Sequence, residues 1–174
     1  MRLLISAALT TLAASSTLSS SLASEATISI DVPQLDVAEY HKPYVAMWVE
    51  QADGGKITNL AVWYDVNHKK NEGTKWLKDV RQWWRRTGRE LALPVDGLSS
   101  PTRAPGTHQV KFDSASKPLE GLSPGKYQLV IEAAREVGGR ELLKIPFEWP
   151  PKAPATSEVK GERELGTVTL KLTP

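Results

Sequence analysis

Apolar and polar side chains alternate with a period of two along most of the chain, the pattern of half-buried β-strands. Residues 43–50 differ because they are apolar on both faces, which predicts a central strand. Glycine-containing turns at 53–55, 124–125 and 138–139 separate these runs. Seven or eight short strands with such turns predict an all-β, antiparallel β-sandwich. The alternating runs are Ile28–Val32, Leu60–Val66, Val110–Phe112, Tyr127–Ala133, Leu143–Phe147 and Val168–Leu172.

One segment has helical spacing instead. Apolar residues at 76, 77, 80, 83 and 84 predict one Trp-rich α-helix over about residues 75–87, with Thr74 as its cap and Gly88 just beyond its end. The opposite face is basic. Three interpretations follow: the helix simply packs on the sheet, its tryptophans stack on a planar ligand, or its basic face meets an acidic partner or membrane.

A single domain over residues 24–174 accommodates these elements. Residues 150–164 are rich in proline and charge and predict a long loop or extended excursion before the last strand. Residues 104–136 resemble the immunoglobulin-like domain of flagellar hook-capping proteins, with a Pro-Gly strand start and a later Pro-Gly-x-Tyr. This resemblance implies an immunoglobulin-like sandwich and carries no function.

The N-terminal segment predicts export. Residues 1–23 hold an early arginine, a short apolar stretch and small residues, as in a secretory signal peptide, with cleavage after Ala23 or Ala26. The stretch is too short and too rich in hydroxyls to predict a permanent membrane span. Cleavage removes Arg2 from 22 basic and 20 acidic residues, which leaves 21 − 20 = +1. Export and balanced charge argue against nucleic acid as a partner.

Metal chemistry has little support in the sequence. The chain has no cysteine, which excludes disulfides, thiolate metal sites and cysteine nucleophiles. Its three histidines, His41, His68 and His108, form no H-x-x-x-H or H-E-x-x-H pair. A haem or metal site assembled in space from these histidines remains one interpretation.

The loop Val95–Gly106 contains the strongest candidate for chemistry. Its residues Asp96, Ser99, Ser100 and Thr102 resemble the acceptor motif of periplasmic flavin transferases, in which a threonine receives FMN through a phosphoester. The motif has alanine where this chain has Pro101, which fixes its own φ and removes an N–H. The resemblance implies FMN on Thr102.

Two neighbouring assignments follow from proximity and residue type. We expect Arg103 to contact the FMN phosphate, and Trp83 or another tryptophan of the helix to cover the flavin ring.

Four blocks of sequence, around 40–65, 75–86, 99–106 and 132–147, resemble in the same order a family of exported bacterial proteins of unknown function, DUF2271. Members commonly carry Ser-Gly-Ala-Thr where this chain has Ser-Ser-Pro-Thr. Their genes tend to neighbour a flavin transferase and PepSY-type membrane proteins.

The combined resemblances imply an exported redox carrier. It holds FMN on Thr102 and relays electrons between a PepSY-type membrane oxidoreductase and an extracytosolic acceptor such as ferric iron. The first alternative is an unmodified immunoglobulin-like binding or assembly module. The second is a haem or metal carrier.

Overall fold

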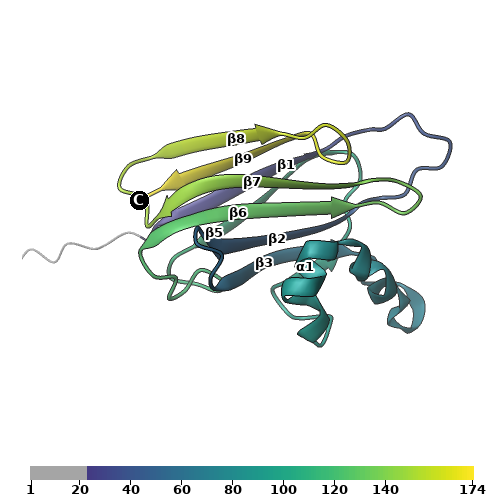
Figure 1. Ribbon diagram of the computed structural model, residues 1–174, viewed down its shortest axis with the longest axis horizontal. Helices are drawn as coiled ribbons and strands as arrows, with labels where there is room; N and C mark the ends of the chain where they lie inside the picture. The colour runs from purple at the N-terminus through teal and green to yellow at the C-terminus, as the bar shows by residue number, and fades with distance from the viewer. Residues whose placement is uncertain (1–22) are drawn as a thin grey trace, which may run out of the picture.

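The computed structural model describes residues 23–174, in which nine strands form two sheets and a helical segment lies beneath one of them (Figure 1). The predicted signal peptide, residues 1–23, lies almost entirely outside the described residues. The strands are β1 (Glu25–Val32), β2 (Tyr44–Gln51), β3 (Ile57–Tyr64), β4 (Ser99–Pro101), β5 (Gly106–Asp113), β6 (Gly125–Ala134), β7 (Arg140–Trp149), β8 (Ala155–Lys160) and β9 (Thr167–Thr173).

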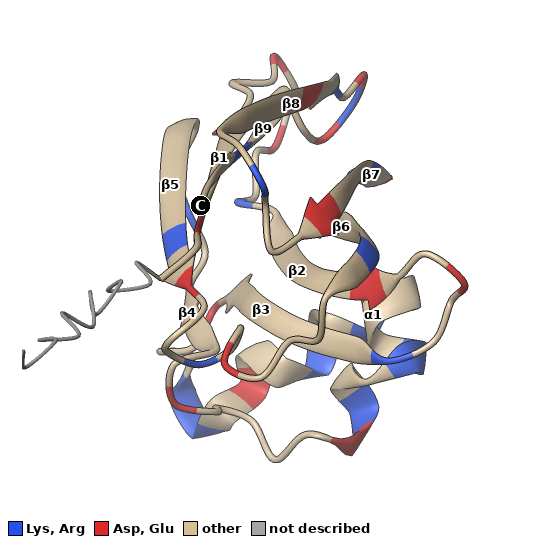
Figure 2. Ribbon diagram, turned by 90° about the vertical axis from the view of Figure 1, so that its left-hand side faces the viewer, with Lys and Arg blue, Asp and Glu red and all other residues tan. Residues whose placement is uncertain are grey.

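The two sheets stack as a sandwich, which confirms the predicted all-β class. One sheet has the order β5-β1-β9-β8 and the other β4-β3-β2-β6-β7. Every pairing is antiparallel except that of β4 with β3, which is parallel. Figure 2 shows the two layers nearly end-on. The immunoglobulin-like connectivity stays a prediction.

Strand β2 lies in the centre of the five-stranded sheet, as its two apolar faces predicted. Val45, Met47 and Val49 point into the core between the two sheets. Ala46 and Trp48 point to the opposite face and join a second core beneath the helical segment. The sheet therefore has a hydrophobic layer on each side, and its inner strands are covered on both faces.

The helical segment is broken into three short pieces, so the single helix predicted over residues 75–87 is wrong in its extent. It consists of the 3₁₀ helix η1 (Lys69–Asp79), the α-helix α1 (Arg81–Arg86) and the 3₁₀ helix η2 (Gly88–Glu90). Val80, with ψ of 71°, separates η1 from α1. Thr74 does not cap the segment, because its hydroxyl donates to Asn71 O within η1.

The segment packs on the sheet, as the first interpretation predicted. Leu77, Val80 and Trp83 are fully buried against the five-stranded sheet. Basic residues of the segment are exposed, among them Lys75, Lys78, Arg81 and Arg85. Figure 2 shows the basic positions of the ribbon in blue.

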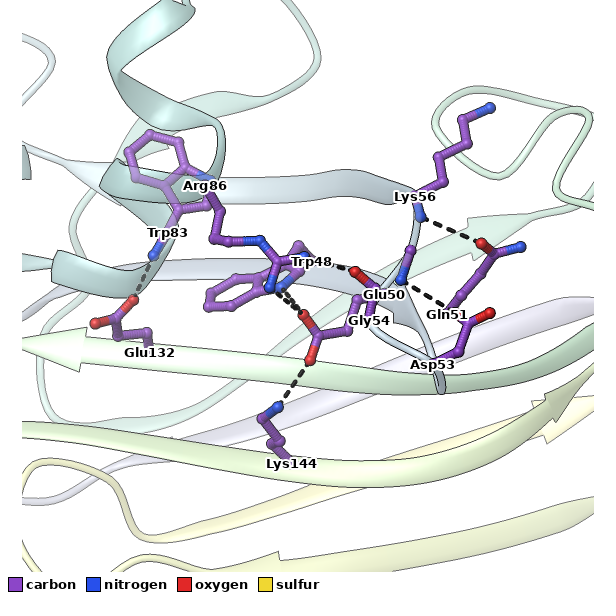
Figure 3. A network of polar contacts seen from close by, with 11 residues as sticks. Trp48, Glu50, Gln51, Asp53, Gly54, Lys56, Trp83, Arg86, Glu132 and Lys144 are labelled. Atoms are coloured by element: carbon purple, nitrogen blue, oxygen red, sulfur yellow. Dashed lines mark hydrogen bonds and ion pairs between the residues drawn. The ribbon is translucent and has the colours of Figure 1, made fainter.

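A buried carboxylate from β6 fixes the start of α1. Glu132 Oε1 accepts the backbone N–H of Gln82 at 2.9 Å, and Oε2 accepts that of Trp83 at 2.8 Å (Figure 3). The side chain of Arg140 also donates to Oε1. The first N–H groups of a helix lack intrahelical partners, and a carboxylate there satisfies them and favours the positive end of the helix. Glu132 is thus the cap that the local sequence lacks.

A second carboxylate, Glu50 on β2, ties the far end of α1 to the sheet. Its oxygens lie 2.7 Å from Lys144 Nζ and 3.5 Å from Arg86 Nη1, and Trp48 Nε1 lies 3.4 Å away (Figure 3). Burial favours a raised pKa for Glu50, but the hydrogen bonds from Lys144 and Trp48 and the two positive charges outweigh it and lower the pKa. The carboxylate therefore stays ionised.

The proline-rich stretch 150–164, predicted as a loop or extended excursion, contains strand β8. Five of the six residues of β8 are exposed, since it is the edge strand of its sheet. A strand that is exposed to solvent on both faces shows no alternation of apolar and polar residues in the sequence. The periodicity of the sequence therefore did not predict β8. Between residues 23 and 174 we find no helix that is long and apolar enough to cross a membrane.

Candidate functional site

The candidate acceptor loop forms the edge of the five-stranded sheet. β4, residues 99–101, pairs in parallel with the end of β3. The backbone N–H of Thr102 continues this ladder by donating to Tyr64 O at 3.0 Å. Thr102 is therefore held by main-chain hydrogen bonds, with its side chain at the end of the sheet.

Pro101 fits this edge without cost to the ladder. Successive backbone N–H groups of a strand point to opposite sides, and that of Thr102 points to β3. The nitrogen of Pro101 therefore points away from β3, where no described strand pairs with β4. Proline is tolerated at such edge positions, and it favours the extended backbone that Ser100 has in β4.

Thr102 lies in the wall of a cavity of about 420 Å³. The cavity opens at the end of the sheet where β2 begins and where β3, β4 and β6 end, because antiparallel neighbours bring starts and ends together. η1 closes one side. The lining residues are Tyr40, His41, Lys42, Tyr44, Asp65, His68, Trp76, Asp79, Thr102, Ala134, Arg135 and Glu136.

The hydroxyl of Thr102 has one fixed partner. Oγ1 donates to the backbone carbonyl of Pro43 at 2.6 Å, and the side chain is half-buried. This hydrogen bond uses the proton of the hydroxyl and fixes its rotamer, and it leaves the oxygen lone pairs free. Thr102 Oγ1 is thus a positioned oxygen at the cavity wall.

Three aromatic side chains, Tyr40, Tyr44 and Trp76, contribute to the cavity. The ring of Trp76 meets His68 edge-on, with the centroids 5.7 Å apart. Burial raises the pKa of Tyr40 and that of Tyr44, so both phenols keep their proton at neutral pH. Walls of this kind suit a planar aromatic ligand, which stacks on rings and takes hydrogen bonds at its edge.

A buried ion pair lies beside these aromatic groups. Arg135 Nε and Nη2 donate to the two carboxylate oxygens of Glu164 at 2.8 and 3.3 Å, and the two side chains are only 6% and 4% exposed. Glu164 also accepts the N–H of Gly139 at 2.7 Å. The Arg135 guanidinium carbon lies 5.9 Å from the centre of the Tyr40 ring.

The two glycines of the β6–β7 turn make room for this pair. A Cβ on Gly138 would lie 2.5 Å from the guanidinium carbon of Arg135, and one on Gly139 would lie 2.8 Å from a Glu164 oxygen. Neither glycine has a positive φ, so backbone conformation does not require glycine here. The close approach of Arg135 and Glu164 to the turn is what leaves no room for a Cβ.

Asp96, Ser99 and Ser100 do not reach this cavity. Asp96 is exposed beside a separate cavity of about 500 Å³, which lies near the start of β3. Ser99 Oγ accepts the N–H of Val95 at 3.0 Å, so this serine shapes the turn before β4. Ser100 is half-buried within β4.

Arg103 and Trp83, the two neighbours assigned to FMN, also lie away from the cavity. The guanidinium carbon of Arg103 lies 5.3 Å from the centre of the Trp63 ring. Trp83 is fully buried, and its indole N–H donates to Asn59 Oδ1 at 2.8 Å. The aromatic side chain of the helical segment that does reach the cavity is Trp76.

Two of the three histidines, His41 and His68, line the cavity. His41 lies 3.0 Å from Glu39 and 3.6 Å from Glu136, through its two ring nitrogens. His108 lies elsewhere, with Nε2 2.7 Å from Ala104 O and its ring edge-on to Trp63. Within residues 23–174, no three His, Asp or Glu side chains are grouped as a metal ion requires.

Sequence reasoning missed most of the cavity wall. Tyr40 and Arg135 come from loops about 95 residues apart, and only the pairing of β2 with β6 brings them together. One signal was present in the Gly138–Gly139 pair, which marks a close approach of the backbone to another group.

Comparison with known proteins identifies one family. A family profile described as "Predicted periplasmic protein (DUF2271)" matches residues 25–167, which span both sheets and the cavity. Neither the curated proteins nor the solved structures include a match to this chain.

Proposed function

We propose that this protein, a member of the DUF2271 family of predicted periplasmic proteins, is a redox carrier with FMN attached covalently to Thr102. It relays electrons between a PepSY-type membrane oxidoreductase and an extracytosolic acceptor such as ferric iron. The observation that carries the proposal is that Thr102, the threonine singled out by the acceptor motif, lies in the wall of an aromatic cavity.

The residues of the cavity fit such a group. Tyr40, Tyr44 and Trp76 offer aromatic surface to a planar ring. The hydroxyl of Tyr40 and Nη1 of Arg135 are buried without a hydrogen-bond partner among the described residues. Such orphaned groups are rare in folded proteins and indicate a missing partner.

Attachment forms a P–O bond between Thr102 Oγ1 and the phosphorus of FMN. The phosphoanhydride bond of a flavin dinucleotide breaks, and a nucleoside monophosphate leaves with that bond's electron pair. The proton of Thr102 goes to a base on the flavin transferase, since the carbonyl of Pro43 that holds it is neutral and too weak a base. The main-chain hydrogen bond to Tyr64 holds Thr102 at the edge of the sheet.

When bound, FMN would supply the electron-transfer chemistry. The protein's part is to hold the ring in place, exclude water from one of its faces and set its electrostatic surroundings. Trp76, on η1, and Tyr44, at the start of β2, are the residues that we assign to the ring faces.

Intact mass spectrometry tests the attachment. The protein is exported together with its flavin transferase and weighed. We expect a gain of one FMN less one water, absent in Thr102→Ala and retained in Thr107→Ala, which removes an exposed threonine hydroxyl from β5. An unmodified mass of the wild-type protein under these conditions contradicts the proposal and favours a binding or assembly module.

A further inference from the structure

Two residues in the wall of the cavity beside Thr102 carry hydrogen-bond donors that have no partner among the described residues. The hydroxyl of Tyr40 and Nη1 of Arg135 are buried, and neither has a partner between residues 23 and 174. Both residues line the cavity, and the guanidinium of Arg135 lies over the ring of Tyr40. The two unused donors therefore belong to one contact pair in one wall.

The geometry of Arg135 shows why Nη1 is free. Its Nε and Nη2 form one edge of the planar guanidinium, and this edge faces Glu164. Nη1 lies on the side away from that edge, so Glu164 cannot reach it. The backbone of Gly138 packs against the guanidinium and holds the plane in place.

Leaving these groups unpaired has an energetic cost. A buried donor without an acceptor destabilises a fold, and more so when the group is charged. Arg135 is paired with Glu164, while burial raises the pKa of Tyr40 and keeps its hydroxyl a donor. A ligand with acceptor atoms offsets this cost on binding, which an apolar ligand does not.

We propose that Tyr40 and Arg135 form the subsite for the carbonyl edge of the flavin's pyrimidine ring and stabilise its reduced, negatively charged form. The inference rests on the proposed function, because it assigns the ring of the FMN on Thr102 to this cavity. Charge and hydrogen bonds near the flavin nitrogens are the means by which proteins tune this cofactor.

The test is the midpoint potential of the FMN-loaded protein. In Tyr40→Phe the ring over Arg135 is kept and only the hydroxyl is lost. We expect the preference for the reduced form to fall about tenfold, which corresponds to a midpoint about 30 mV lower for a two-electron couple. Arg135→Lys, which removes Nη1 and keeps a positive charge, is expected to lower it further.

The matched control is Tyr64→Phe. Tyr64 also has a buried hydroxyl without a partner among the described residues, but it does not line the cavity. We expect its midpoint to equal that of the wild type. Thermal melts of the unloaded variants check folding, and Tyr40→Phe should melt no lower than the wild type because it removes an unpaired polar atom.

The outcomes separate the two proposals. If Thr102 gains the mass of FMN but wild type, Tyr40→Phe and Tyr64→Phe have the same midpoint potential, the subsite is overturned. The carrier function is then left intact. If Thr102 gains no mass, free riboflavin is titrated into the unmodified protein by fluorescence. Binding weakened about tenfold in Tyr40→Phe alone then supports the subsite, and equal binding or no binding overturns it.

Discussion

Replacement of Glu132 by glutamine is the most direct test of how the helical segment is held over the sheet. The side chain is fully buried, and its two oxygens accept the N–H groups of Gln82 and Trp83 and the side chain of Arg140. Glutamine has nearly the same shape but only one oxygen. In either orientation its NH₂ group faces a donor instead of accepting from it.

The size of the effect follows from these contacts. With the NH₂ group at the position of Oε2, the buried N–H of Trp83 loses its acceptor, which costs about 1–3 kcal/mol. With the opposite orientation, Gln82 and Arg140 lose theirs. The lost charge also weakens the pair with Arg140, whose side chain is 35% exposed, and this adds a few tenths of a kcal/mol. We expect a loss of about 2–3 kcal/mol from a total stability of about 5–15 kcal/mol.

Urea denaturation followed by tryptophan fluorescence measures this loss. In a chain of this size, 2–3 kcal/mol also lowers the melting temperature by about 5–10 °C. Glu148→Gln is the matched control, because it makes the same chemical change at an exposed position of β7. We expect it to change stability by less than about 0.5 kcal/mol. A Glu132→Gln protein as stable as this control would refute the argument that the carboxylate caps α1.

Two further predictions concern the loops. Burial favours a raised pKa for Glu141, but four backbone N–H groups of residues 162–165 outweigh it and lower the pKa. Their stabilisation is complete above the ordinary value of 4.5 and is lost as the pH falls through the folded value. Hydrogen exchange of the backbone amides of residues 162–165, corrected for intrinsic rates, measures this loss. We expect these amides to lose protection below pH 4.5 in the wild type and to lack it at all pH values in Glu141→Gln. Val137 has φ of 54° and is 78% exposed, so Val137→Asn should raise the free energy of unfolding by about 1 kcal/mol in urea, whereas the β-branched Val137→Thr should not.

The sheets were predictable from sequence because their burial repeats along the chain. β2 shows this best, since an apolar run on both faces has no other stable position than the middle of a covered sheet. The break at Val80 was not predictable. The group that caps α1 is Glu132, about fifty residues later, and helical spacing contains no sign of it.

The candidate site was predictable only at its centre. The acceptor motif indicated Thr102, and the structure finds that residue in a cavity wall. The other members of the motif, Asp96 and Ser99, shape or flank the turn before β4. Tyr40 and Arg135 lie in loops whose proximity depends on strand pairing, so apart from the Gly138–Gly139 pair no local pattern pointed to them.

The pairing of β1 with β9 joins the two ends of the domain. Glu25 lies opposite Thr173, so the first and last strands are neighbours although almost the whole domain separates them in sequence. The five-stranded sheet uses only residues 44–149 and is complete in itself. The four-stranded sheet is completed only by residues 167–173, because β9 joins β1 to β8, and contacts of such long range form slowly. Without β9, the edge strand β8 has no neighbour in its sheet, and the part of the main core that packs against Val168, Leu170 and Leu172 stays uncovered.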